Sequence, residues 1–359
     1  MMVEFSEVFT DSTKFARKIK KGDYLDSGIY PIIDQGQEFV IGYTNDEKGL
    51  YKDMPAIIFG DHTRIIKYID RPFFIGADGV KVLKTKIDDV VYKYLYYALR
   101  NIDIINTGYN RHFKWLKESK IKLPDLKEQQ KIATILDSIE NIVNFKNMQL
   151  QEYDQLIKSR FVEMFGDQNK NPFKWNVKTI GETCKLKSGN SLPLSFENEG
   201  GPIPYIKVGD MNLSGNEKYI TNSSRYVTVK TAGKGVFDIG TIIFPKRGGA
   251  IGTNKKRMTI SPICADLNVM GVTPLEKLNS HYLLAYFDEI DMGSLNNGSS
   301  VPQINNLDIA PLRICLPPME LQNQFGDFVQ QVDKLKFVVQ KSLDETQKLF
   351  DSLMQEYFG

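Results

Sequence analysis

The feature that most constrains the fold of this 359-residue chain is a long internal repeat. The segment 123–166, which opens "LPDLKEQQKIATILD", aligns without a gap to the segment 316–359, which opens "LPPMELQNQFGDFVQ". Ten of the 44 aligned positions are identical, and both segments end in Phe-Gly. Because self-similarity at a fixed spacing marks a repeated structural unit, we expect the same element to occur twice.

Shorter matches precede each copy of this segment, and they occur in the same order. Their offsets increase steadily from 173 to 193 residues, as insertions into the second copy would produce. The matched pairs are "IYPII" (29–33) with "PIPYI" (202–206), "PAIIFGDHTR" (55–64) with "GTIIFPKRGG" (240–249), "GADGVKVL" (76–83) with "CADLNVMGV" (264–272), and "TGYNRHFKWL" (107–116) with "NGSSVPQINNL" (297–307). The chain is therefore expected to be a globular unit and a helix, followed by a second globular unit and a second helix.

Both copies of the repeat show apolar residues at alternating spacings of four and three, which is typical of a coiled coil. A helix of about 40 residues would be roughly 60 Å long, and Leu-Pro suits a helix entry. The alternative is a helix that packs on a globular core. The residues predicted to form the coiled-coil seam are Ile132, Leu136, Ile139, Leu150, Ile157, Phe325, Val329, Val332, Leu343 and Phe350.

The globular segments mix short β-rich runs with turn residues and one helical patch each, which predicts an α+β fold. We predict two globular domains, 1–122 and 167–315, which alternate with long spacer helices, 123–166 and 316–359. The helices are expected to pair as an antiparallel coiled coil, giving a pseudo-two-fold object. The globular segments carry net charges of +3 and +4, and the helical segments −2 and −3. This division favours a polyanionic partner for the globular segments, although solvated faces often differ by a few charges.

The repeated Leu-Pro helix entry resembles that of the specificity subunit (HsdS) of type I restriction-modification systems, over essentially the whole chain. "WNVKTIGETCKLKSGNS" (175–191), followed by "PIPYIKVGDMN" (202–212), is similar to the start of a target-recognition domain of that family. "GYNRHFKWLKESKIKLP" (108–124) is similar to its end. The second helix entry departs from the pattern at 320–323. The first globular unit lacks the Trp-x-Val-Lys-x-Ile-Gly opening of the second, so the sequence gives no signal for a matching first strand.

The resemblance implies that each target-recognition domain reads one half of a split, asymmetric sequence in double-stranded DNA. It also implies docking of two methyltransferase subunits and of restriction subunits. S-adenosylmethionine, ATP and Mg²⁺ would serve those partners, and no cofactor or metal is expected on this chain. In agreement, the sequence holds no Asn/Asp-Pro-Pro-aromatic methyltransferase signature and no phosphate-binding loop, and its three histidines are widely separated. We therefore expect a recognition subunit that is not an enzyme.

Candidate DNA-contacting residues are the basic, amide and hydroxyl side chains in the turn-rich strings. Arg and the side-chain amides can read base edges in the major groove, whereas Lys is suited to phosphate. Positions that recur in both units are favoured, namely Arg64 with Lys246 and Arg247, and 110–112 with 299–303. The full set is His62, Thr63, Arg64, Tyr109, Asn110, Arg111, His112, Lys114, Lys246, Arg247, Asn254, Lys255, Lys256, Arg257, Asn297, Ser299, Ser300 and Gln303.

Three other interpretations stay open at this point. The chain could be an autonomous DNA nuclease, which would need a carboxylate cluster for a metal. It could be a scaffold that binds no DNA, or the specificity subunit of a related system whose partner fuses methyltransferase and nuclease.

The sequence contains no run of 18 apolar residues, so no membrane span is expected. The three cysteines are widely spaced and give no disulfide framework. The cytoplasm is the expected location.

Overall fold

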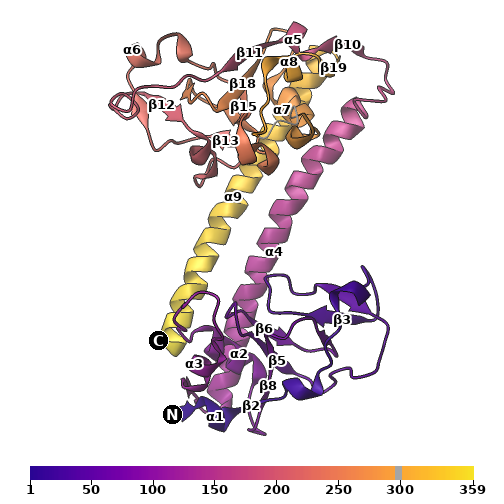
Figure 1. Ribbon diagram of the computed structural model, residues 1–359, viewed down its shortest axis with the longest axis vertical. Coiled ribbons are helices and arrows are strands. Elements are labelled where there is room, and N and C mark those ends of the chain that lie inside the picture. Colours follow the sequence, from indigo (N-terminus) through magenta and orange to yellow (C-terminus); the bar gives the residue numbers. More distant parts are fainter. Residues whose placement is uncertain (296–300) are drawn as a thin grey trace. The chain divides into compact units, whose positions relative to one another are not determined.

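Two long helices organise the computed structural model, which describes residues 1–295 and 301–359 (Figure 1). Helix α4 spans Leu126–Phe165 and helix α9 spans Met319–Phe358, and each has 40 residues. The chain divides into two compact units, each containing part of both helices. Unit 1 comprises Met1–Met148 and Gln340–Gly359, and unit 2 comprises Gln149–Val339.

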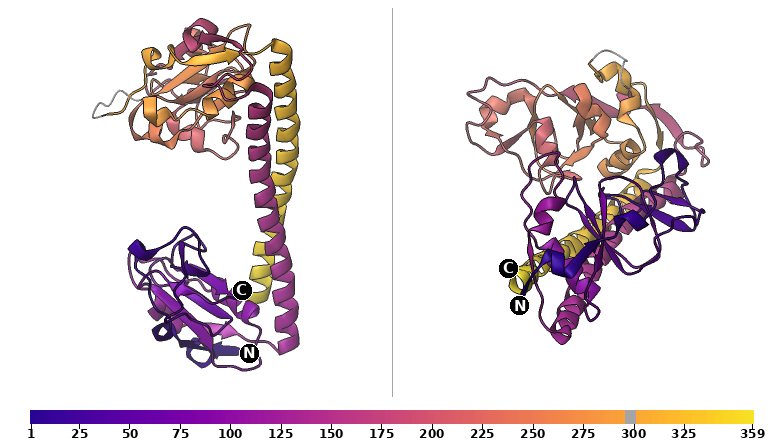
Figure 2. Two further views of the ribbon diagram at one scale, coloured as in Figure 1. Left: turned by 90° about the vertical axis from the view of Figure 1, so that its right-hand side faces the viewer. Right: turned by 60° about the horizontal axis from the view of Figure 1, so that its bottom comes forward.

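Unit 1 contains three small sheets and three short α-helices besides its parts of α4 and α9. In Figure 2 its strands gather on one side of the unit-1 part of α4. Its elements in chain order are β1 (Met2–Glu4), α1 (Phe5–Val8), β2 (Phe9–Asp11), β3 (Tyr30–Ile33), β4 (Gly42–Thr44), β5 (Ala56–Gly60), β6 (Ile66–Ile69), β7 (Phe74–Ile75), β8 (Val80–Thr85), α2 (Tyr92–Arg100), α3 (Phe113–Lys117) and β9 (Lys120–Lys122).

Unit 2 repeats this order of strands and α-helices with two additions, the edge strand β13 and the short helix α6. Its elements are β10 (Asn176–Thr179), α5 (Ile180–Thr183), β11 (Cys184–Ser188), β12 (Ile203–Ile206), β13 (Tyr219–Ile220), β14 (Tyr226–Val227), α6 (Val229–Ala232), β15 (Ile242–Pro245), β16 (Arg257–Thr259), β17 (Cys264–Ala265), β18 (Val269–Pro274), α7 (Ser280–Asp288), α8 (Asn306–Ile309) and β19 (Arg313–Leu316).

The sheets of the two units share one topology. The main sheet has the order β2-β8-β5-β6 in unit 1 and β11-β18-β15-β16-β13 in unit 2. The second sheet has the order β4-β3-β7 in unit 1 and β14-β12-β17 in unit 2, and in each the last pair is parallel. The repeat seen in the sequence is therefore a repeat of the α+β fold, as predicted.

The first strand of unit 1 is present, although its sequence lacks the opening seen in unit 2. Strand β1 pairs antiparallel with β9, as β10 pairs with β19. Only the central residue of β1, Val3, is buried, and it faces Ile121 in the register. Such a three-residue edge strand needs one apolar side chain rather than a motif, which is why it could not be predicted from the residues.

A buried glutamine explains why the helix opening is repeated. The Gln129 side chain donates from Nε2 to the Pro124 carbonyl at 2.9 Å and accepts at Oε1 from the Val91 backbone N–H at 3.0 Å. Gln322 makes the matching bonds in unit 2, to the Pro317 carbonyl at 2.8 Å and from the N–H of Asn279 at 2.9 Å. Because Val91 and Asn279 are the N-caps of α2 and α7, each glutamine ties a long helix to the short helix of its own repeat.

The Phe-Gly endings of the repeat also have matching roles. In unit 2 the ring of Phe165, at the end of α4, lies 4.8 Å from that of Tyr282 on α7. In unit 1 the ring of Phe358, at the end of α9, lies 5.3 Å from that of Tyr94 on α2. The Tyr94 hydroxyl donates to the Lys122 carbonyl of β9, and the Tyr282 hydroxyl donates to the Cys315 carbonyl of β19, so these rings pack at a fixed place.

The two long helices lie side by side and antiparallel within each unit, which confirms the predicted pairing. In unit 1 the ammonium of Lys146 donates to the Ser342 carbonyl at 2.9 Å and to the Thr346 hydroxyl at 2.6 Å. In unit 2 Lys336 forms an ion pair with Asp154. Three polar residues within the apolar pattern, Lys146, Thr346 and Lys336, therefore have partners on the facing helix.

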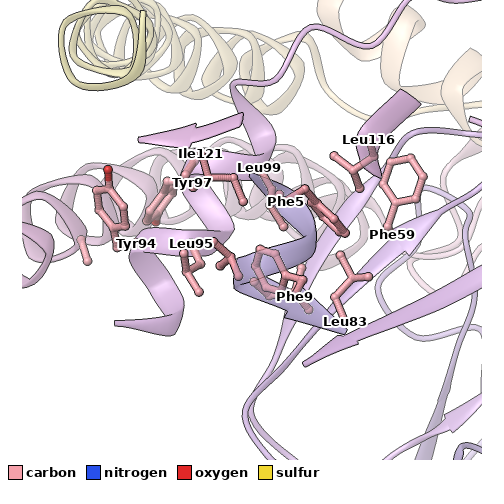
Figure 3. Close-up of a cluster of buried hydrophobic side chains, with 14 of the residues drawn as sticks. Phe5, Phe9, Phe59, Leu83, Tyr94, Leu95, Tyr97, Leu99, Leu116 and Ile121 are labelled. Atoms are coloured by element: carbon pink, nitrogen blue, oxygen red, sulfur yellow. The ribbon is translucent and has the colours of Figure 1, made fainter. Parts of the chain in front are cut away.

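The apolar seam residues fall into two groups. Leu150 and Leu343 are half-buried, as a two-helix interface leaves them, and Ile157 is half-buried against the core of unit 2. The others are buried and, except for Val332, belong to globular core clusters: Ile132, Leu136, Ile139 and Phe350 in unit 1, and Phe325 and Val329 in unit 2. Figure 3 shows the unit-1 core, where Phe5 and Phe9 lie among side chains of α2 and the main sheet. Near its start, each long helix therefore packs on the globular part that precedes it in the chain. Phe350, near the end of α9, packs on the core of unit 1.

Candidate nucleic-acid interface

Three loops of unit 1 converge beyond the end of strand β5. They are the loop after β3 (34–41), the loop after β5 (61–65) and the loop before α3 (105–112). The Asp61 N–H donates to the Gly79 carbonyl at 2.7 Å, and the His112 N–H donates to the Asp61 carbonyl at 2.8 Å. The Asp61 carboxylate accepts from the N–H of Phe113 at 2.8 Å, so this buried residue anchors the start of α3.

Gln35 fixes the turn that follows β5. Its Oε1 accepts from the His62 N–H at 3.1 Å, and its carbonyl accepts from the Thr63 hydroxyl at 2.5 Å. A Cβ on Gly60 would lie 2.2 Å from the Thr63 hydroxyl, and one on Gly79 would lie 2.4 Å from Gln35 Oε1. A side chain at either position would displace Thr63 or Gln35, so glycine at both positions favours the observed approach of the loops.

The turn presents a stacked pair of rings, His62 and Tyr109. Their centroids are 4.5 Å apart and their planes differ by 7°. Tyr109 is 87% exposed, whereas His62 is half-buried with its Nδ1 3.1 Å from the Asn110 carbonyl. The Asn110 side chain donates to the Thr107 carbonyl at 2.7 Å, which closes the loop that carries Tyr109.

The remaining predicted residues of unit 1 differ in accessibility. Arg111 and Lys114 are exposed, and the Lys114 ammonium lies 4.2 Å from the Trp115 ring centroid. Arg64 has a left-handed φ of +63° and donates to the Ile104 carbonyl at 2.9 Å. His112 is completely buried, with Nδ1 3.0 Å from the Asp61 carbonyl. We therefore remove His112 from the DNA-contacting set, because a ring with no exposed surface cannot meet a ligand.

Unit 2 builds the same frame from different residues. The Lys246 N–H donates to the Asn268 carbonyl at 2.8 Å, and the Ile304 N–H donates to the Lys246 carbonyl at 2.9 Å. These two bonds match those of Asp61, so Lys246 occupies the equivalent place. The Lys246 ammonium donates to the Ser188 hydroxyl at 2.8 Å, and burial, with Arg247 nearby, lowers its pKa.

These matched backbone bonds correct the predicted pairing of Arg64 with Lys246 and Arg247. They align His62 with Arg247 and Arg111 with Gln303, because these residues flank the matched backbone bonds. Arg64 has no basic counterpart, since its position lies two residues beyond that of His62 and falls on 249, a glycine. Arg247 is exposed, and its backbone forms an isolated bridge with that of Gln303.

The run 254–257 serves mainly to hold the fold of unit 2. Asn254 is left-handed, with φ of +54°, and its Oδ1 accepts from Lys256 Nζ and from the Met292 N–H, each at 2.9 Å. Lys256 is 5% exposed, also donates to the Ile290 carbonyl, and has its pKa lowered by burial. Arg257 donates to the Lys256 carbonyl at 2.8 Å. Buried Lys256 is therefore also removed from the DNA-contacting set.

Three residues of the predicted set, Asn297, Ser299 and Ser300, lie outside the described residues. Lys255 is half-buried and donates to Asn212.

Within residues 1–295 and 301–359, no group of three or more His, Cys, Asp or Glu side chains is placed to hold a metal ion. In the same ranges, no helix is long and apolar enough to cross a membrane.

Sequence reasoning missed the residues that shape the loops. Besides Gln35 and Asp61, Lys67 is buried and donates from Nζ to the carbonyls of Asp34 and Glu38 at 2.8 and 2.6 Å. The lysine within the largely apolar strand β6 could have indicated this contact, because a buried ammonium needs hydrogen-bond acceptors close by. Its role is to hold the loop that contains Gln35.

A family model for the type I restriction modification DNA specificity domain matches residues 1–153 and 172–345. The chain belongs to this family. The specificity subunit of the type I restriction enzyme EcoR124I/EcoR124II of Escherichia coli is 25% identical over 363 residues, covering 91% of this chain and 84% of the relative. The MjaIX specificity subunit of Methanocaldococcus jannaschii is 26% identical over 300 residues, covering 74% and 68%.

The solved structures agree on the fold. The type I restriction-modification S subunit from M. genitalium superposes with a TM-score of 0.64 at 17% identity, covering 100% of this chain and 96% of that one. Membership in the specificity family confirms the predicted resemblance, and it identifies the chain as a subunit for DNA target recognition rather than an enzyme. The interpretation as an autonomous nuclease is not supported.

Proposed function

We propose that this specificity subunit reads a split, asymmetric DNA sequence, one half with the loops of unit 1 and the other half with the loops of unit 2. The observation that carries this proposal is the matched loop frame with unmatched side chains. The same backbone bonds present His62 and Arg111 in unit 1, and Arg247 and Gln303 in unit 2. Because these side chains prefer different bases, the two halves of the target are expected to differ.

The DNA-contacting residues within this proposal are those that the structure leaves accessible. Arg111 and Arg247 are the base-reading candidates, since an exposed guanidinium can bind guanine O6 and N7 together. Lys114 is the candidate for a phosphate contact, which positions the protein without reading sequence. Thr63 and Gln303 complete the two loop surfaces.

The proposal includes two copies of a methyltransferase subunit, docked along the long helices. Large apolar side chains are exposed at three pairs of repeat-equivalent positions, which is unusual for a helix facing only water. They are Ile142 with Leu335, Phe145 with Val338, and Leu156 with Leu349, with exposed fractions between 45% and 65%. Each unit contains one member of every pair. Equivalent surfaces on two repeats are suited to two copies of one partner.

The partners would supply the chemistry. S-adenosylmethionine would bind the methyltransferase subunits, and ATP and Mg²⁺ would serve the restriction subunits, with no cofactor on this chain. Methylome sequencing of cells that express the chain with its methyltransferase partner tests the whole proposal. We expect one motif of two unequal halves separated by a fixed gap. A contiguous motif, or methyl transfer to DNA by the purified chain alone, would contradict it.

Docking is tested separately by native mass spectrometry of the complex. Phe145→Asp and Val338→Asp each place a charge in one of the two apolar surfaces, so each is expected to reduce the number of bound methyltransferase subunits from two to one. Lys131→Asp is the control, because this exposed lysine of α4 lies outside the apolar positions. Loss of both copies from either single variant would contradict two equivalent surfaces.

A further inference from the structure

His62 is held more firmly than an exposed loop side chain needs to be. Its backbone N–H is bound by Gln35 Oε1 at 3.1 Å, its Nδ1 lies 3.1 Å from the Asn110 carbonyl, and its ring stacks on Tyr109. These three contacts fix the position, the tilt and the rotation of the imidazole. The edge that carries Nε2 is the part of the ring that they leave available.

The contact at Nδ1 also determines the tautomer. A backbone carbonyl can only accept a hydrogen bond, so Nδ1 must carry the hydrogen. In the neutral imidazole Nε2 then bears a lone pair and acts as an acceptor. Among residues 1–295 and 301–359, no group is hydrogen-bonded to His62 Nε2. The structure therefore holds an oriented acceptor at a fixed place on the unit-1 loop surface.

The Tyr109 ring supports the His62 imidazole by stacking on one of its faces. It is 87% exposed and parallel to the imidazole within 7°. The loop that carries it is closed by the bond from Asn110 to the Thr107 carbonyl and by the bond from the Gly108 N–H to Asn106 Oδ1 at 3.0 Å. A preorganised side chain loses little conformational entropy on binding, which favours discrimination between ligands.

We propose that His62 is a specificity-determining residue of unit 1, whose Nε2 accepts a hydrogen bond from the exocyclic amino group of a base in the major groove. The base is adenine, through N6, or cytosine, through N4, because these are the donors that the groove displays. Guanine O6 and thymine O4 are acceptors and would oppose the lone pair. This inference rests on the proposed function, since it assumes that the unit-1 loops face DNA.

The equivalent position in unit 2 carries a side chain with the opposite hydrogen-bonding character. The position equivalent to His62 in unit 2 is Arg247, which can only donate and is suited to guanine. The same place on the frame thus carries an acceptor in one unit and a donor in the other. Such a difference would let two units of one fold read opposite hydrogen-bonding patterns.

A cycle of protein variants and base analogues tests the proposal in the complex with the methyltransferase subunits. In the target half read by unit 1, each adenine other than the methylated one is replaced singly by purine, and each cytosine by 2-pyrimidinone, which removes the amino group. Binding is measured by fluorescence anisotropy at one fixed salt concentration, with the original chain and with His62→Phe. Phenylalanine keeps a flat ring against Tyr109 but has no acceptor.

At one position, loss of the amino group is expected to weaken binding of the original complex about tenfold, and binding of the His62→Phe complex less than twofold. The matched control, Arg247→Ala, is expected to leave that tenfold effect unchanged. Equal losses in both proteins at every position would overturn the proposal. It would also be overturned if His62→Phe weakened all duplexes alike with a smaller salt dependence, because that marks a phosphate contact. Both results would leave the proposed function standing, whereas an original complex with no preference for its target over random duplex would overturn both.

Discussion

Replacing Gln129 by alanine tests why the helix opening is repeated. The substitution leaves the Val91 N–H without its acceptor and the Pro124 carbonyl without its donor. Gln129 is 3% exposed, so water replaces these bonds poorly. Buried polar groups that lose a partner cost about 1–3 kcal/mol each. Because Val91 and Pro124 are themselves half-buried and regain some hydration, we expect a loss of about 2–3 kcal/mol in the free energy of unfolding of unit 1.

Gln322→Ala is the matched substitution in unit 2, and it is expected to cost more. Gln322 is completely buried and makes a third bond, from Nε2 to the Lys277 carbonyl at 3.2 Å. One further hydrogen bond adds about 1 kcal/mol, so the expected loss is roughly 3–4 kcal/mol. The order of the two effects follows from the number of bonds and from burial, and it does not depend on the absolute values.

The two tryptophans of the chain allow each unit to be followed separately. Trp115 lies in unit 1 and Trp175 in unit 2. Urea unfolding of Gln129→Ala is measured by fluorescence in a Trp175→Phe background, and that of Gln322→Ala in a Trp115→Phe background. Gln130→Ala is the control, since this exposed neighbour has only a 3.4 Å contact with Thr134, and it should change stability by less than about 0.5 kcal/mol. If Gln129→Ala were no more destabilising than Gln130→Ala, the glutamine would not be the reason for the repeat.

Three further predictions concern other parts of the chain. Hydrogen bonds from Lys178 and from the backbone lower the pKa of the Glu182 carboxyl to about 2, so its stabilising effect should be complete above about pH 4.5 and be lost as the pH falls through 2; an NMR titration of Glu182 with a midpoint near its ordinary value would refute this. Burial raises the pKa of the Cys184 thiol to about 12, so Ellman's reagent at pH 8 should label it only after unfolding, and rapid labelling of the native chain would contradict the structure. Four residues inserted after both Gln149 and Ser342 should lengthen each helix by about 6 Å and widen the gap in the methylated motif by about one or two base pairs; an unchanged gap at full efficiency would show that the helices do not set it.

The long helices were predictable because their signal is periodic and extends over many residues. Apolar residues at spacings of four and three determine which face of a helix is buried, whatever that face meets. The sequence did not show that Ile132 and Leu136 pack on a globular core while Leu150 and Leu343 lie at the helix interface. Both environments select the same residue types, so the periodic pattern cannot distinguish them.

The loop surfaces were only partly predictable, because accessibility depends on contacts that are distant in sequence. His112 and Lys256 lie in polar, turn-rich strings, yet both are buried against carbonyls supplied by other segments. The pairing of Arg111 with Gln303 needed the backbone bonds of both units, because an alignment of the strings 107–116 and 297–307 from their first residues places Arg111 against Val301. Gln35 could not be singled out, because nothing near it in sequence marks its contact with the turn after β5.

Methylome sequencing of complexes that carry Arg111→Ala or Arg247→Ala tests most directly the claim that each unit reads its own half of the target. Both guanidiniums are on exposed loops, one in each unit, so neither substitution should disturb folding. Each variant is expected to relax or weaken recognition by about 1–3 kcal/mol at positions in one half only, with different halves affected. Relaxation of both halves by a single variant, or of the same half by both variants, would contradict the account.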